Sequence, residues 1–236
     1  MKPSDLTNYD KITQAYIENT EKENSFNNIY ERPYMLSIFD KFEGKTVLDL
    51  GCGTGFYSFY ALEQKASVTS VDASRKMIDL IQKKDSAGKL RLVHADLAEG
   101  LPFLGDDSQD YIICSLVLHY LENWDKIIED CRRVLRKSGK LYVSTHHPFS
   151  DYLYLKKPGY FDRYLVEDTW GSNRNPFKVH YYTKSLTDVL KPFFKSGLIF
   201  RNIEEPMPGL KCKEIDPDAY KKFLKKPAFL FLTLEK

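Results

Sequence analysis

Residues 46–55 read Thr46-Val47-Leu48-Asp49-Leu50-Gly51-Cys52-Gly53-Thr54-Gly55. A short apolar run that ends in a glycine cluster is typical of a buried strand turning sharply into a helix. Glycine permits the tight turn, and it lets a ligand approach the backbone because no Cβ stands in the way. The helix expected at residues 56–64 would then offer free N–H groups at its start.

Strand and helix patterns alternate downstream of this loop. We expect strands at residues 67–71, 90–94, 111–115 and 140–145. Ser74 can cap a helix after the first of them, and Asn123 or Asp125 can cap a later helix that runs to about Arg136. That helix should end at Lys137-Ser138-Gly139, with glycine near the C-cap. Alternation at this spacing predicts βαβ units and a doubly wound α/β sandwich with a parallel sheet.

Two flanking regions break this alternation. Residues 1–43 have apolar positions at helical spacing and predict a helical cap. Residues 146–184 are rich in aromatic residues, proline and glycine with little regular period, so we expect a substrate lid there. Residues 185–236 predict one helix and two final strands, at 185–195, 199–204 and 229–235. We therefore expect a single domain over residues 1–236, with its ligand-binding core at 44–145.

Composition limits the classes of partner. The chain has 236 residues, with 35 Lys and Arg against 33 Asp and Glu. Nucleic-acid binding needs a clustered positive field, and the sequence has only short basic doublets, so we expect no nucleic-acid partner. The longest apolar run is shorter than the roughly 20 residues of a bilayer span, and no signal peptide is apparent. The four cysteines form no CxxC pair. We expect a cytoplasmic protein without a membrane or metal partner.

Acidic residues follow two more of the expected strands. Asp72 ends the second strand, 21 residues after Gly51, where a carboxylate can accept both hydroxyls of a ribose. Asp96 follows the third strand and could accept the exocyclic amine of adenine. A helix cap is the alternative role for either residue. Asp49, two residues before the first glycine, suits a cationic ammonium group better than a pyrophosphate.

The glycine spacing separates two ligand classes. A dinucleotide-binding loop has the pattern G-x-G-x-x-G, whereas this loop is G-x-G-x-G with Phe56 in the place of the last glycine. The spacing therefore disfavours a nicotinamide oxidoreductase. A tight strand–helix turn without a ligand is the other alternative.

Taken together, these segments resemble the class I S-adenosylmethionine-dependent methyltransferases. The matching motifs lie within about residues 30–145: the 47–55 loop, Asp72, Asp96, and the stretches 101–103, 110–111, 115–120 and 133–141. The resemblance implies a Rossmann-like, mostly parallel seven-stranded sheet whose last strand, residues 229–235, runs antiparallel. One departure is Lys137-Ser138-Gly139, where the family often has Pro-Gly-Gly.

The resemblance also implies which residues bind S-adenosylmethionine. Asp49 would hold the amino group through water, Asp72 the ribose, and Asp96 with Leu97 the edge of the adenine. Arg32 would meet the carboxylate, with a surface arginine as the alternative. The complete expected set is Tyr16, Arg32, Asp49, Gly51, Cys52, Gly53, Gly55, Asp72, Ala73, Met77, Asp96, Leu97 and Ser115.

The acceptor is less well defined by the sequence. Methyl transfer from a sulfonium depends mainly on positioning, so no catalytic dyad is required. His119, His146 and His147 follow strands at the expected ligand edge, and we expect His147 to assist the acceptor, with packing as the alternative. Aromatic residues from both flanking regions predict a pocket for a small-molecule acceptor: Tyr9, Tyr16, Tyr30, Tyr34, Phe149, Tyr152, Trp170, Tyr181 and Tyr182. A non-catalytic cofactor-binding or adaptor protein on the same fold is the alternative function.

Overall fold

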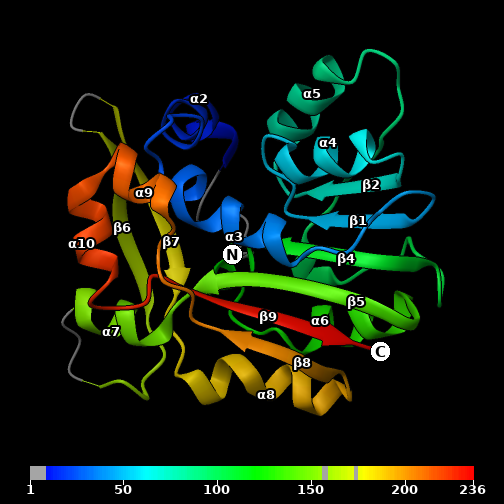
Figure 1. Cartoon of the computed structure of the whole chain (residues 1–236). Helices are drawn as coiled ribbons and strands as arrows, with labels where there is room; N and C mark the ends of the chain where they lie inside the picture. Colours follow the sequence, from blue (N-terminus) through cyan, green and yellow to red (C-terminus); the bar gives the residue numbers. More distant parts are fainter. Residues whose placement is uncertain (1–8, 156–158, 173–174) are drawn as a thin grey trace.

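The computed structural model describes residues 9–155, 159–172 and 175–236. Its centre is a seven-stranded sheet with the order β3-β2-β1-β4-β5-β9-β8 (Figure 1). The strands of this sheet are β1 (Thr46–Leu50), β2 (Ser67–Asp72), β3 (Arg91–His94), β4 (Gln109–Ser115), β5 (Leu135–His146), β8 (Ile199–Glu204) and β9 (Phe229–Glu235). Strands β1 to β5 pair in parallel, and β9 runs antiparallel to both β5 and β8. The structure therefore confirms the expected fold class.

Helices cover both faces of the sheet. One face carries α3 (Arg32–Ile38), α4 (Phe56–Glu63) and α5 (Arg75–Lys84), and the other carries α6 (Asp125–Val134) and α8 (Leu186–Ser196). Successive residues of a strand point to opposite faces of the sheet. Val47 therefore packs in the core under α3, α4 and α5, and Leu48 packs in the core under α6 and α8. Residues 47–50 of β1 are buried, and three of these four are apolar, because the strand is covered on both faces. No helix in the described ranges is long and apolar enough to cross a bilayer.

The strand order reverses between β1 and β4. To one side of this point the chain adds β2 and β3, and to the other side it adds β5, β9 and β8. The loops after β1 and β4 therefore leave the sheet in opposite directions, and a crevice opens at the carboxyl ends of these strands. Figure 1 shows the arrowheads of β4 and β5 pointing toward the side of the molecule where α2 (Tyr9–Thr20) lies.

The predicted end of the helix before β5 is wrong. Lys137-Ser138-Gly139 lies inside β5 and does not end a helix, because α6 ends at Val134 and β5 begins at the next residue. The reason is backbone pairing with Lys236. The N–H of Ser138 donates to the carbonyl of Lys236, and the N–H of Lys236 donates to the carbonyl of Gly139. A contact so distant in sequence has no local signal.

Residues 146–184 contain more regular structure than expected. Helix α7 (Pro148–Leu155) opens this region, and β6 (Leu165–Ser172) and β7 (Asn175–Tyr182) form an antiparallel hairpin separate from the main sheet. The buried hairpin residues Val166, Val179 and Tyr181 pack against Tyr16 of α2. The hairpin is thus stabilised by a helix from the other end of the chain, which periodicity alone does not indicate.

Short helices complete the fold. A π-helix, η1 (Asn27–Glu31), leads directly into α3, and the expected N-terminal helical cap is confirmed from residue 9 onward. The 3-10 turns η2 (Leu97–Glu99) and η3 (Leu118–Tyr120) follow β3 and β4. Helices α9 (Leu210–Ile215) and α10 (Pro217–Phe223) were not expected, and their buried residues pack in the same core as Ile29 and Tyr30 of η1.

We predict that Gly51→Ala destabilises the free protein more than Gly88→Ala. Both glycines have left-handed backbone, with φ of +66° and +62°, so both substitutions cost about 1–2 kcal/mol. A Cβ on Gly51 would also lie 2.4 Å from Val117 Cγ2, whereas one on Gly88 meets no described atom within 4 Å. Overpacking should add about 1–3 kcal/mol for Gly51→Ala. Urea unfolding without ligand measures both, and equal losses would contradict the close contact with Val117.

Candidate functional site

A cavity of about 240 Å³ lies at the point where the strand order reverses. It is lined by the loops that follow β1, β2, β3 and β4, together with α2 and η3. The lining residues are Tyr9, Asp10, Tyr16, Gly51, Gly53, Asp72, Ala73, Ser74, Met77, Asp96, Leu97, Ser115, Leu116, Val117, Tyr120 and Leu121. The cavity thus joins residues from the first and middle parts of the chain.

Asp72 connects the two loops on one side of this cavity. Its Oδ2 accepts a hydrogen bond from Gly53 N (2.8 Å), and its Oδ1 accepts one from Ser74 N (2.8 Å). Each carboxylate oxygen can accept a further bond, so the group retains capacity for a hydroxyl-bearing ligand. Burial raises the pKa of this carboxyl. The loop backbone therefore holds Asp72 in place for ligand binding.

Asp96 lines the cavity and has one carboxylate oxygen without a hydrogen bond among the described residues. Its Oδ1 caps η2 by accepting from Ala98 N (2.9 Å), so the expected capping alternative is realised by one oxygen. The other oxygen, Oδ2, is buried and has no hydrogen-bond partner among the described residues. Because an unsatisfied buried acceptor is costly, this atom indicates where a ligand would place an N–H or O–H donor.

The charges around the cavity are all of one sign. Asp10, Asp72 and Asp96 line it, and the described lining includes no lysine or arginine. Carboxylates suit a ligand that carries hydroxyl and amine donors and positive charge. A pyrophosphate would be repelled, and this agrees with the glycine spacing in disfavouring a dinucleotide.

Residues 48–143, which supply most of the lining of this cavity, match the family model described as a methyltransferase domain. This part of the chain is a methyltransferase domain of the class I S-adenosylmethionine-dependent type. S-adenosylmethionine is the cofactor of this family. The cavity fits it because carboxylates that can accept hydrogen bonds line the cavity.

Several known proteins are similar to this chain in sequence or in fold. An uncharacterized protein of Haemophilus influenzae is 28% identical, covering 90% of this chain and 89% of its own. A ubiquinone biosynthesis O-methyltransferase of Coxiella burnetii is 32% identical over 48% of each chain, so the match spans about half of that relative's length. A crystal structure of an S-adenosylmethionine-dependent methyltransferase from Mesorhizobium loti superposes with a TM-score of 0.70. It is 21% identical and covers 87% of this chain and 97% of its own.

The methyltransferase cavity brings together most of the residues predicted for the cofactor. Those that line it are Tyr16, Gly51, Gly53, Asp72, Ala73, Met77, Asp96, Leu97 and Ser115. Their individual contacts with the cofactor stay predictions. The other expected residues lie outside the lining: Arg32, Asp49, Cys52, Gly55 and His147.

The Asp49 side chain points into the protein interior. Its Oδ2 accepts a hydrogen bond from Ser58 Oγ (2.6 Å), and Ser58 Oγ in turn accepts one from Ser70 Oγ (2.8 Å). Burial raises the pKa of Asp49 to about 7. The carboxyl thus links α4 to strands β1 and β2, and it does not line the cavity where the ammonium group was expected.

Arg32 is buried, so the surface alternative considered for it is wrong. Its Nη1 donates to Asn28 Oδ1 (2.5 Å), and its guanidinium carbon lies 4.1 Å from the centroid of the Phe56 ring. Nη2 is 3.6 Å from Glu21 Oε1. These contacts join the N-terminal cap to α4, and the predicted contact with the cofactor carboxylate stays a prediction.

Glu31 is a buried residue that the sequence did not single out. Its Oε1 accepts hydrogen bonds from Ser115 Oγ (2.7 Å) and Ser144 Oγ (2.6 Å), and its Oε2 accepts one from Tyr57 OH (2.7 Å). Burial raises the pKa of this carboxyl. Glu31 therefore fixes the Ser115 hydroxyl at the cavity and ties the N-terminal cap to β4 and β5. No local pattern could have revealed it, because its three partners are distant in sequence.

His147 lies outside the cavity. Its Nδ1 accepts a hydrogen bond from Phe149 N (3.2 Å), and its Nε2 lies 2.5 Å from Glu205 Oε1. Burial lowers the pKa of this imidazole. Because Nδ1 is bonded to the backbone of α7 and the ring lies outside the cavity lining, the geometry favours the packing alternative over assistance to the acceptor.

We predict that Asp72→Asn weakens binding of S-adenosylhomocysteine about 10- to 100-fold, since hydrogen bonds to a charged acceptor are worth about 1.5–3 kcal/mol. The matched control is Asp79→Asn, which changes an exposed carboxyl on α5 outside the cavity lining. Isothermal titration calorimetry measures both affinities. Equal affinity in the two variants would show that Asp72 does not hold the ligand.

We also predict a pH dependence for Asp49→Asn. An unfolded aspartate titrates near about 3.9, whereas folded Asp49 has a pKa of about 7, so the folded state binds the extra proton between these values. Stability of the parent should therefore fall relative to Asp49→Asn as pH rises from about 4 to about 7 and stay level above that. Urea unfolding of both proteins across this range measures the difference, and a constant difference would contradict the raised pKa.

Proposed function

We propose that this chain transfers the methyl group of S-adenosylmethionine to a small-molecule acceptor by in-line displacement. The observation that carries the proposal is a tyrosine wall, formed by Tyr9 and Tyr16 of α2 and Tyr120 of η3, along the cavity. Ser115, near which the methionine part of the cofactor is predicted, lines the same cavity.

The tyrosine wall is a packed unit. The Tyr9 ring meets the rings of Tyr16 and Tyr120 edge to face, with centroids 5.2 and 5.5 Å apart. The hydroxyls of Tyr9 and Tyr120 are hydrogen-bonded to each other. Such a surface suits an organic molecule of modest size, because aromatic walls bind through area and leave few positions for polar contact.

Helix α2, which carries Tyr9 and Tyr16 of the wall, is held in place by hydrogen bonds near both of its ends. Asp10 Oδ1 accepts hydrogen bonds from Ser74 Oγ (2.6 Å) and Lys76 N (3.0 Å) at the start of α5. Farther along, Asn175 Nδ2 of the hairpin donates to Glu18 Oε2 (2.6 Å). An acceptor that is part of a long polymer would have to displace these contacts, whereas a small molecule needs only a local opening.

The chain's own residues supply binding and exclusion of water. S-adenosylmethionine, when bound, supplies an electrophilic methyl group on a sulfonium. Asp72 and Asp96 would orient it, and the carboxylates nearby favour its positive charge. Burial raises the pKa of Tyr9, and it raises that of Tyr16 to about 12, so these hydroxyls stay protonated near neutral pH and act as donors.

The test is an acceptor screen with the purified protein and S-adenosylmethionine, measuring S-adenosylhomocysteine formed. Small phenols, amines, thiols and carboxylic acids are offered separately. We predict that at least one class raises product above the acceptor-free rate, and that Asp72→Asn lowers this turnover about tenfold or more while Asp79→Asn does not. Tight cofactor binding without turnover of any class would favour the non-catalytic cofactor-binding protein.

A further inference from the structure

Glu31, the last residue of η1, is a buried carboxylate that contacts a residue of the cofactor cavity. Its side chain is almost fully buried, at 1% exposed. Among the described residues no lysine or arginine forms an ion pair with it, and the adjacent Arg32 pairs with Glu21 instead. A buried carboxylate without a cationic partner is costly, even where hydroxyl groups donate to it. Such a group is a candidate for binding a cationic ligand.

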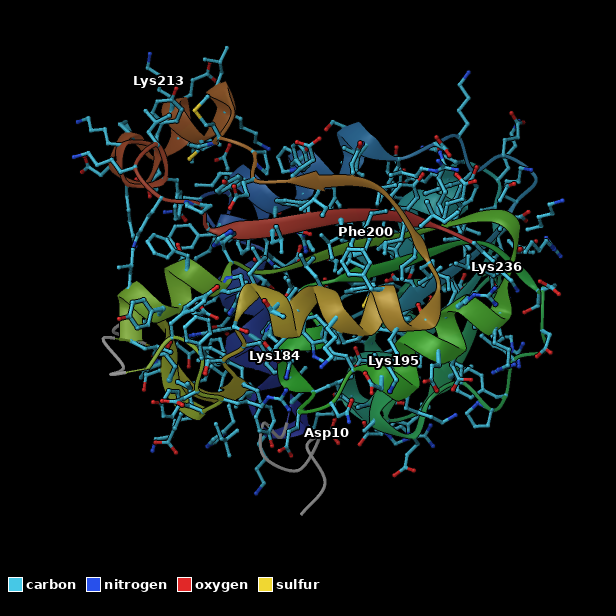
Figure 2. All side chains as sticks on the ribbon, turned by 90° about the horizontal axis from the view of Figure 1, so that it is seen from below. Asp10, Lys184, Lys195, Phe200, Lys213 and Lys236 are labelled. Atoms are coloured by element: carbon cyan, nitrogen blue, oxygen red, sulfur yellow. The ribbon has the colours of Figure 1, made fainter. Side chains whose placement is uncertain are left out.

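Two of the hydroxyls that donate to Glu31 come from neighbouring strands. Ser115 ends β4, and Ser144 lies opposite it in β5, as its partner in the parallel ladder. Strand β5 is in turn paired with β9, which Figure 2 shows in red beside the green β5. The third hydroxyl, that of Tyr57, comes from the first turn of α4. The positions of all three donors are therefore fixed by the sheet and the helix packed on it.

The residue after Ser115 has an unfavourable backbone conformation. Leu116 has φ of +49°, in the left-handed region that a leucine rarely adopts. Its N–H donates to the carbonyl of Ser144 (2.9 Å) and also lies 3.2 Å from Ser144 Oγ. Strained residues persist where their neighbours hold them, and they gather at ligand sites. Ser144, which donates to Glu31, thus also holds Leu116, and both Ser115 and Leu116 line the cavity.

Glu31 determines how the Ser115 hydroxyl is used. An ionised carboxylate only accepts, so the single hydroxyl hydrogen of Ser115 is committed to Glu31 Oε1 (2.7 Å). A ligand that contacts Ser115 Oγ must then bring an N–H or O–H donor. An ammonium group suits this oxygen best, because the negative charge of Glu31 lies one hydrogen bond behind it.

The ionised form of Glu31 is favoured by its surroundings when a cation is bound. Burial raises the pKa of this carboxyl, whereas the three hydroxyl donors act in the opposite direction. A positive charge on a nearby ligand also favours the ionised form.

Asp49 lacks a comparable connection to the cavity. It is the carboxylate for which the sequence predicted the amino group of the cofactor, but its Oδ2 accepts from Ser58 and it does not line the cavity. Glu31, in contrast, accepts directly from the cavity residue Ser115. The two carboxylates therefore provide a direct comparison.

We propose that Glu31 is a positioning residue for the amino group of S-adenosylmethionine, and that it acts through Ser115. The carboxylate orients the Ser115 hydroxyl as an acceptor, and its charge complements the ammonium group that this hydroxyl receives. Glu31 thus takes the role that the sequence assigned to Asp49. The proposal concerns the cofactor and not the methyl acceptor, so it holds or fails independently of the proposed small-molecule transfer.

The test is isothermal titration calorimetry of the full chain with S-adenosylhomocysteine and with its deaminated analogue, which keeps the carboxylate and lacks the amino group. We expect Glu31→Gln to weaken binding of S-adenosylhomocysteine about tenfold, because the amide carries no charge and can donate to Ser115. The affinity of the deaminated analogue should stay unchanged, which also verifies that the variant is folded. A purely structural role would weaken both ligands by the same factor.

Two further variants separate the routes by which Glu31 could act. Ser115→Ala should also weaken S-adenosylhomocysteine selectively, and its effect should be less than additive with that of Glu31→Gln, because both substitutions remove one interaction. Asp49→Asn is the matched control, since it neutralises a buried carboxylate outside the cavity lining. It should leave the ratio of the two affinities unchanged.

Three results would overturn the proposal. Equal weakening of both ligands by Glu31→Gln would make Glu31 a structural residue only. A ratio changed by Asp49→Asn and not by Glu31→Gln would return the amino group to Asp49. Full additivity with Ser115→Ala would exclude action through Ser115. Each of these leaves the proposed function intact, whereas an acceptor screen without turnover counts against that function and leaves the affinity ratio as it is.

Discussion

The carboxylate of Asp72 is the contact on which the candidate site depends most. It accepts backbone N–H groups from the loop after β1 and from the turn before α5, so one side chain sets the distance between two neighbouring strand ends. The sheet reverses its order beside this point, and the crevice opened by that reversal becomes a defined cavity because Asp72 fixes one of its walls. The glycines of the loop allow the approach, since Gly51 and Gly53 both have left-handed backbone.

Buried carboxylates surround this contact. Glu31 and Asp49 are buried, Asp72 is partly buried at the cavity, and burial raises the pKa of each carboxyl. Such a group of like charges destabilises the free protein, because ionisation is unfavourable in a medium of low dielectric constant. A ligand with a sulfonium and an ammonium would relieve this repulsion.

The acceptor side depends on contacts between distant parts of the chain. Helix α2 packs on the hairpin through Tyr16, and its Asp10 binds the start of α5. Tyr120 of η3, a single turn after β4, lines the cavity, and the preceding residue, His119, lines a second cavity of about 10 Å³. One short turn therefore presents neighbouring side chains to two cavities.

The sequence by itself determined the α/β fold, the bounds of β1, β8 and β9, and the residues Gly51, Gly53, Asp72 and Asp96 at the cavity. These features follow from local patterns, because an apolar run, a glycine turn and an acid after a strand each act over a few residues. Only the tertiary structure decided the continuation of β5 through Ser138, the inward turn of Asp49, the role of Glu31 and the pairing of His119 with His146. Each of these depends on partners brought together by packing, and a buried polar group takes whatever partner the fold provides.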